Sequence, residues 1–174
     1  MALFNLTDLS ARLSRDQRLL GIDPGRKRIG LALSDAGRRL ATPHSTIPRG
    51  KLAAVAAAIG AIARAQHVGG LIVGLPLQMD GAFGPAAQAA RDWALALSQA
   101  TALPAAMQDE RLSTATAADF LSEHTRLSTA ARRAAVDRLA AAIILQDALD
   151  WLATAAAATG PERSERPPPP PATA

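Results

Sequence analysis

The order in which strand and helix patterns follow one another is the strongest constraint on the fold of this chain. Short apolar runs bounded by Gly, Pro and Asp predict strands, and longer alanine-rich stretches predict helices. The predicted strands are 18–23, 28–35, a segment within 40–47, 71–76 and 104–113, and the predicted helices are 51–66, 85–100, 114–123 and one or two within 129–159. This order is typical of an α/β fold with a mixed five-stranded sheet, antiparallel in its first three strands and then parallel, flanked by helices.

The two ends of the chain differ from this central pattern. In the N-terminal extension, 1–17, Leu6, Leu9 and Leu13 recur at helical spacing after Thr7, which predicts a short helix capped by Thr7 and docked on the domain. Residues 160–174 include five consecutive prolines, which make neither helix nor sheet hydrogen bonds, so a disordered tail is expected. A single domain is therefore expected over 18–159.

Composition excludes several classes of site. The chain has no Cys and only three His, which rules out disulfides, a thiol nucleophile and a zinc site built on thiolates. Aromatic residues make up 3% of the chain, too few for a platform of stacked bases. The net charge is +4, and Arg supplies 17 of the 19 cations, which favours a phosphate-rich partner. Any metal ion is expected to be bound by oxygen.

Membrane association is not expected from the sequence. No run reaches the roughly 18 uncharged apolar residues of a membrane span. Residues 1–17 also lack the basic start and apolar block of a secretory signal. We therefore expect a cytoplasmic protein without a membrane partner.

Two carboxylates stand where predicted strands end. Asp23 follows the first strand, and Gly25 permits a tight chain reversal beside it. Asp109 and Glu110 end the fifth strand, where alternation places them on opposite faces, so only one of them can share a face with Asp23. The alternatives are that Asp23 only initiates a turn and that Asp109 and Glu110 belong to a solvated charge cluster.

A third carboxylate, Asp137, lies within the last predicted helix. It shares one helix face with Ala141, Ile144, Ala148 and Leu152, so it heads an otherwise apolar stripe. The alternative is an Asp in the first turn of a helix, where it interacts favourably with the helix dipole. Burial in the stripe would require a positive partner, and a divalent ion held by oxygen ligands, Mg²⁺ or Mn²⁺, fits that requirement.

Asp23, Glu110 and Asp137 together are typical of a metal-dependent phosphodiester nuclease. In such a site divalent ions activate water and stabilise the leaving oxygen, so no His or Ser nucleophile is needed. Arg26, Lys27 and Arg28 follow Asp23 in the predicted hairpin turn. They are candidate phosphate contacts, and the alternative is a solvated charged turn.

Four ordered blocks of sequence support this interpretation. LLGIDPGRKRIGLALSD, LIVGLPLQMDG, DERLST and VDRLAAAIILQ resemble the YqgF (RuvX) family of RNase H-like proteins over about 18–150. The family is similar in fold to the RuvC Holliday-junction resolvases and is implicated in maturing the 5′ end of pre-16S ribosomal RNA in ribosome biogenesis. The resemblance implies that Asp23, Glu110 and Asp137 are the catalytic and metal-binding residues.

The resemblance also suggests how substrate is bound. Gln78, where the family more often has Asn, and Arg111 are expected to contact nucleic acid beside the carboxylates. The expected partners are structured precursor ribosomal RNA and pre-ribosomal particles, with the protein acting as a monomer or a homodimer.

Three other functions share this fold or one of its motifs. A four-way-junction DNA resolvase would use the same carboxylates and would require a dimer. A catalytically idle RNA-binding or transcription-associated module would keep the fold without the chemistry. An actin-like or sugar-kinase ATPase also begins with an Asp-x-Gly hairpin, but it needs a second lobe for which this chain is too short.

Overall fold

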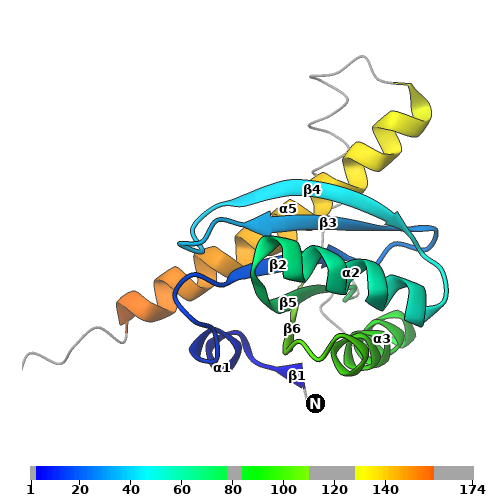
Figure 1. Ribbon diagram of the computed structural model, residues 1–174. Helices are drawn as coiled ribbons and strands as arrows, with labels where there is room; N and C mark the ends of the chain where they lie inside the picture. Colours follow the sequence, from blue (N-terminus) through cyan, green and yellow to red (C-terminus); the bar gives the residue numbers. More distant parts are fainter. Residues whose placement is uncertain (1–2, 78–83, 110–127, 159–174) are drawn as a thin grey trace, which may run out of the picture.

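A mixed sheet covered on both faces forms the centre of the molecule. The computed structural model describes residues 3–77, 84–109 and 128–158. The described strands are β1 (Leu3–Phe4), β2 (Arg18–Asp23), β3 (Arg28–Ser34), β4 (Ala41–Pro48), β5 (Val68–Leu75) and β6 (Ala105–Asp109). The described helices are α1 (Leu6–Ala11), α2 (Leu52–Gln66), α3 (Pro85–Thr101) and α5 (Thr129–Ala158). The strands lie in the order β1-β6-β5-β2-β3-β4 (Figure 1).

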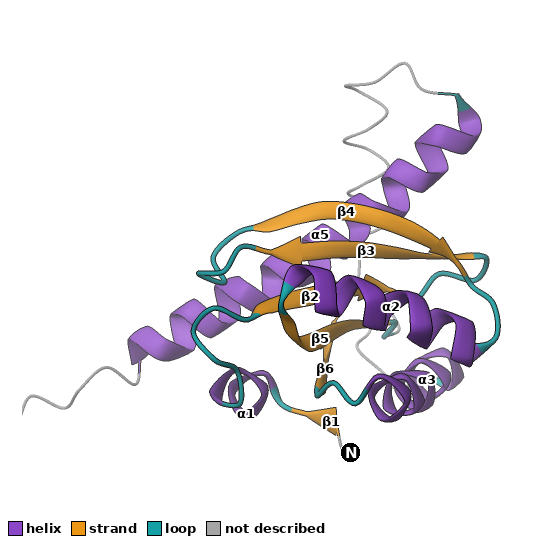
Figure 2. Cartoon of the chain, viewed as in Figure 1, coloured by secondary structure: helices purple, strands orange, loops and turns teal. Residues whose placement is uncertain are grey.

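The pairing of β2 to β6 confirms the expected RNase H-like arrangement. β2 pairs antiparallel with β3, and β3 pairs antiparallel with β4. On its other side β2 pairs parallel with β5, which pairs parallel with β6. Helices α2 and α3 cover one face of the sheet, and α5 covers the other (Figure 2). The carboxyl ends of β2, β5 and β6 therefore meet at one edge of the sheet.

The N-terminal extension adds a strand that the sequence did not predict. Leu3 pairs with Ala105, so β1 is a sixth strand, parallel to β6. The helix of the extension is confirmed, but its cap is wrong: the Asn5 side chain, not Thr7, accepts a hydrogen bond from the Asp8 backbone N–H, at 2.7 Å. Leu9 is fully buried beneath α5. The extension is therefore packed into the domain.

The predicted helix 51–66 is confirmed as α2, but its expected stop signal is wrong. Helix α2 is capped by His67, which adopts the left-handed conformation with φ 53°, and Gly69 and Gly70 lie inside β5 rather than ending the helix. Side chains of the extension pack closely over both glycines: a β-carbon at Gly69 would lie 2.7 Å from Leu13 Cδ2, and one at Gly70 would lie 3.0 Å from Leu9 Cδ1. The last helical segment is one continuous helix, α5, within the described chain. Residues 110–113, the predicted helix 114–123 and the Pro-rich tail lie outside the described residues.

Helix α5 approaches the sheet closely at two glycines. A β-carbon at Gly21 would lie 2.8 Å from the Ala141 carbonyl oxygen and 2.7 Å from the Leu145 β-carbon. A β-carbon at Gly30 would collide with the backbone carbonyl of Asp137. Both strands therefore need glycine at these positions, because only glycine leaves room for the helix backbone.

Helix α5 is long and apolar enough, by length and composition, to cross a membrane. In the structure its apolar face packs on the sheet. Ile144, Leu145 and Leu149 are at most 1% exposed. These contacts are those of a core helix in a globular domain.

Candidate active site

The structure brings Asp23 and Asp137 together in one open cleft. Asp23 is the last residue of β2, and Asp137 lies on α5. The cleft has a volume of about 640 Å³. Its other lining residues are Pro24, Gly25, Arg26, Arg49, Pro76, Ala86, Ala89 and Ala90. Asp23 and Asp137 therefore converge in the structure as predicted, although they lie 114 positions apart in the sequence.

Asp23 is held rigidly and is nearly shielded from water. It pairs with Gly30 across the β2–β3 ladder and is 8% exposed. Burial, followed by the nearby charge of Asp137, raises the pKa of Asp23 from 3.8 to about 6. Ionising Asp23 therefore costs more free energy than ionising an exposed aspartate, and a nearby cation would offset that cost.

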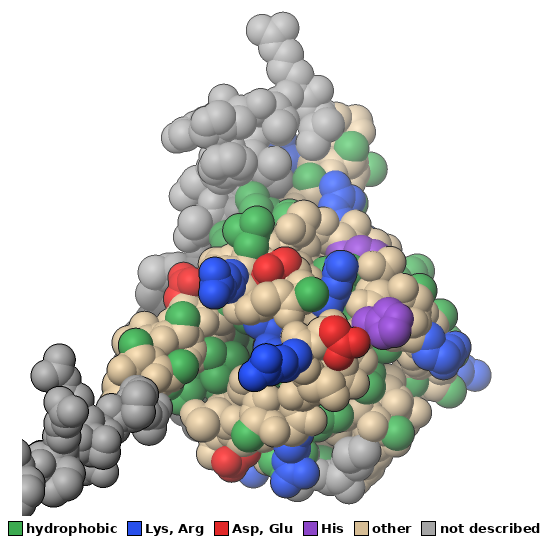
Figure 3. All heavy atoms as spheres, turned by 60° about the vertical axis from the view of Figure 1, so that its left-hand side comes forward, with side chains coloured by type: hydrophobic (Ala, Val, Ile, Leu, Met, Phe, Trp, Pro, Cys, Tyr) green, Lys and Arg blue, Asp and Glu red, His purple; other side chains and the backbone are tan. Residues whose placement is uncertain are grey.

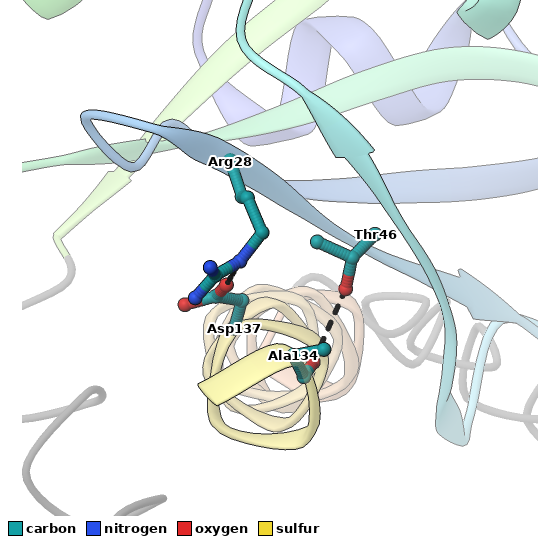
Figure 4. A network of polar contacts seen from close by, with 4 residues as sticks. All are labelled: Arg28, Thr46, Ala134 and Asp137. Atoms are coloured by element: carbon teal, nitrogen blue, oxygen red, sulfur yellow. Dashed lines mark hydrogen bonds and ion pairs between the residues drawn. The ribbon is translucent and has the colours of Figure 1, made fainter. Parts of the chain in front are cut away.

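Asp137 is fixed by contacts between α5 and the first strands. Arg28 Nε donates to Asp137 Oδ2 at 2.7 Å, and Thr46 Oγ1 donates to the Ala134 carbonyl at 3.1 Å (Figure 4). Asp137 lies in the third turn of α5, not the first, so the helix dipole does not explain its position. The positive partner that a half-buried carboxylate requires is Arg28.

The three cations of the hairpin turn have different surroundings. Arg26 and Lys27 are exposed, and Arg26 lines the cleft. Arg28 was predicted as a phosphate contact, but in this structure its Nε donates to Asp137. On the face turned forward in Figure 3, basic side chains are mixed with acidic ones. Arg26 and Lys27 therefore remain candidate phosphate contacts near Asp23, whereas Arg28 is paired with Asp137.

The remaining predicted site residues, Glu110, Gln78 and Arg111, lie outside the described residues. Strand β6 is described as far as Asp109, immediately before Glu110. Pro76, which directly follows β5, lines the cleft. Within the described part of the chain, no three His, Cys, Asp or Glu residues converge into a metal-binding group.

Sequence reasoning missed Arg49, which forms one wall of the cleft. Its Nη1 donates to the Pro24 carbonyl at 2.7 Å and to the Gly25 carbonyl at 3.2 Å. Its guanidinium also lies against the ring of Trp93 on α3. Nothing in the local sequence indicated this, because an Arg after a strand is most often a solvated charge.

Comparison with known proteins agrees with this geometry. The family described as "RuvX: Holliday junction resolvase" matches residues 17–151. The chain belongs to the RuvX family. The match includes both cleft carboxylates and every described strand except β1.

Two curated relatives of this RuvX chain are similar over most of its length. A protein of Acidiphilium cryptum is 57% identical over 152 residues, covering 87% of this chain and 96% of its own. A protein of Gluconacetobacter diazotrophicus is 55% identical over 150 residues, covering 86% of this chain and 97% of its own. Both carry the name "Putative pre-16S rRNA nuclease". A solved Thermus thermophilus RuvC structure aligns over 79% of this chain and 97% of its own, at 13% identity and a TM-score of 0.47.

The raised pKa of Asp23 predicts how the stability of this RuvX chain depends on pH. The folded state holds the Asp23 proton more tightly than the unfolded state, so stability falls as the pH rises from about 4 to about 6. In metal-free buffer at pH 7 we expect Asp23→Asn to be more stable than the wild type by about 2–3 kcal/mol. At pH 4 the two proteins should have similar stability. Thermal melting with a chelator from pH 4 to 7.5 measures this difference.

Asp35 provides a control of opposite sign. It accepts backbone N–H bonds from Leu40, Arg39 and Gly37, which lower its pKa. Its ionised form therefore stabilises the fold above the unfolded-state pKa, and Asp35→Asn should lower the melting temperature at pH 7. An Asp23→Asn protein that melts below the wild type at pH 7 would show that the buried charge is already compensated.

Proposed function

We propose that this RuvX protein is a metal-dependent phosphodiester nuclease that processes the 5′ end of pre-16S ribosomal RNA. The observation that carries the proposal is the convergence of Asp23 and Asp137 in one cleft beside exposed cations. The names of its relatives supply the substrate. We also propose a cytoplasmic location and pre-ribosomal particles as partners.

The residues of the cleft fit a hard divalent cation such as Mg²⁺ or Mn²⁺. Asp23 is a buried carboxylate whose charge a cation would stabilise, and Asp137 offers further oxygen ligands in the same cleft. Asp23 and Asp137 would hold the ion, and Glu110 is proposed as the third ligand. When bound, the ion would activate water and stabilise the leaving oxygen of the cleaved phosphodiester.

The protein's own residues orient the substrate and the carboxylates. Arg28 holds Asp137 by one carboxylate oxygen, which fixes the side chain at the cleft. Arg26 and Lys27 are positioned to bind the phosphate backbone near Asp23, and Gln78 and Arg111 are proposed as further contacts. Contacts of this kind fix the position of a strand and do not read its bases.

Resolution of four-way DNA junctions is the second candidate. The description of the family itself favours it, because it names a Holliday junction resolvase. The same carboxylates would serve either substrate, and cutting both strands symmetrically would require two copies of the chain.

The first test is cleavage by purified wild-type protein with and without a divalent ion. We expect a structured RNA carrying the precursor 5′ end to be cut in Mg²⁺ or Mn²⁺ and to remain intact in chelator. A protein that binds this RNA but does not cut it in either ion would instead be the idle binding module.

Removing the two exposed cations of the turn should weaken substrate binding in a salt-dependent way. For the double variant Arg26→Ala, Lys27→Ala we expect the slope of log affinity against log salt to decrease by about one unit per lost contact. Affinity should fall to a similar degree for RNAs of different sequence, because the contacts are to phosphates. Titration of labelled RNA at several salt concentrations measures both effects. Arg64→Ala, on exposed α2 surface, is the control, and an unchanged slope in the double variant would exclude the contacts.

A further inference from the structure

The side chain of Arg49 joins three elements that meet at the cleft. Arg49 follows β4 directly, and its Nη1 donates to the Pro24 and Gly25 carbonyl oxygens at 2.7 and 3.2 Å. Its Cζ lies 4.8 Å from the centroid of the Trp93 ring, which belongs to α3. One guanidinium therefore links the end of β4, the β2–β3 turn and α3.

The backbone of Arg49 contacts the same turn. Its N–H donates to the Lys27 carbonyl at 3.0 Å. Arg49 thus binds three of the four residues, 24–27, that connect β2 to β3. Pro24 follows Asp23 directly, so the hydrogen bond to its carbonyl restrains the peptide next to the buried carboxylate.

Two kinds of contact hold the Arg49 side chain in this partly buried site. A hydrogen bond from a guanidinium is charge-assisted and stronger than a bond between neutral groups. A cation against the face of a Trp ring is also attracted by the ring quadrupole. The Trp93 ring contacts one side of the Arg49 guanidinium, and Nη1 of Arg49 faces the turn. The Arg49 side chain is therefore braced between Trp93 and the turn.

We infer that Arg49, braced by Trp93, positions the Asp23 carboxylate and thereby sets the affinity of the cleft for a divalent cation. The inference rests on the proposed metal-dependent nuclease. Arg49 acts through the β2–β3 turn, so it is a positioning residue. Some groups orient a metal ligand without touching the metal themselves. Removing such a group typically lowers metal affinity or activity by about 10- to 100-fold.

The test is the dissociation constant for Mn²⁺, measured by electron paramagnetic resonance on the full chain without RNA. We expect Arg49→Gln to raise this constant about tenfold and Trp93→Leu to raise it by a smaller factor. Arg49→Lys should be intermediate, because it keeps the charge but not the fork of donors. Trp93→Phe should stay near the wild type, because it keeps an aromatic face. Arg64→Gln on α2 is the matched control and should bind Mn²⁺ like the wild type.

Two further readouts separate positioning from other roles of Arg49. If Arg49 contacted phosphate directly, Arg49→Gln would reduce the salt slope of RNA binding by about one unit, whereas positioning predicts a change below about 0.3. If Arg49 only stabilised the fold, its removal would lower the melting temperature and leave the Mn²⁺ constant of the folded protein unchanged. Either result would overturn the inference, and the milder Lys and Phe variants decide the matter if Arg49→Gln does not fold.

The same measurements distinguish this inference from the proposed function. Wild-type protein that binds Mn²⁺ but cuts no RNA would contradict the nuclease, while the Mn²⁺ constants would still decide the role of Arg49. Wild-type protein that binds no Mn²⁺ would contradict both.

Discussion

Asp137→Asn is expected to slow RNA cleavage by roughly a thousandfold, which corresponds to about 4 kcal/mol in activation free energy. Asn keeps the size of Asp but lacks the charge that holds a hard cation. Asp23→Asn should slow RNA cleavage by a similar factor, because Asp23 lies in the same cleft. Single-turnover cleavage of labelled precursor RNA at saturating Mn²⁺ measures both losses.

Asp150→Asn is the matched control for this loss. Asp150 is an exposed carboxylate on the same helix, outside the cleft, so the same change should leave cleavage unaltered. Both cleft variants should still bind RNA, since the exposed cations of the turn are retained. Full cleavage by Asp137→Asn, in a preparation free of other nucleases, would remove Asp137 from the catalytic residues.

Gly30→Ala is expected to destabilise the fold by about 3 kcal/mol or more, because the added β-carbon collides with the backbone of α5 at Asp137. The added β-carbon meets backbone atoms of the helix, which cannot move aside as the end of a flexible side chain can. For a chain of this size the melting temperature should fall by about 6–12 °C. Folded Gly30→Ala protein should also cleave slowly, because the helix must move and carry Asp137 away from Asp23.

Gly60→Ala is the control for this steric effect. Gly60 lies within α2, and an added β-carbon would make only an ordinary contact with the Arg64 side chain, at 3.5 Å. The same substitution there should stabilise the protein by about 0.5–1 kcal/mol, since Ala favours helix more than Gly. Thermal melting of both variants tests the pair of predictions. Small and equal changes in melting temperature for Gly30→Ala and Gly60→Ala would mean that α5 does not pack against Gly30.

Local pattern was sufficient to predict most of the strands and helices of the domain. The apolar run 18–23 and the turn after it match β2 and the β2–β3 connection, because alternation and Pro-Gly punctuation are local signals. The apolar stripe below Asp137 correctly indicated a buried face of α5: Ala141, Ile144 and Ala148 are fully buried. A helix face and a strand end therefore made Asp23 and Asp137 candidates, and the family resemblance selected them over the alternatives.

Contacts between distant segments could not be predicted in this way. The short β1 has no pattern of its own, and it forms because β6 offers an unpaired edge. Arg28 was predicted to contact phosphate and Arg49 was not singled out, and the structure gives each a specific partner from another element. Gly69 and Gly70 looked like a helix stop because their role depends on side chains of the extension.

The most direct measurement compares two substrates side by side with the wild-type protein in Mn²⁺. One is precursor RNA carrying the unprocessed 5′ end of 16S ribosomal RNA, and the other is a DNA four-way junction, with product ends mapped for both. We predict metal-dependent cleavage of the RNA near the mature 5′ end, lost in Asp23→Asn, with the junction left intact. Selective cutting of the junction with the RNA untouched would contradict the proposed function and establish the resolvase instead.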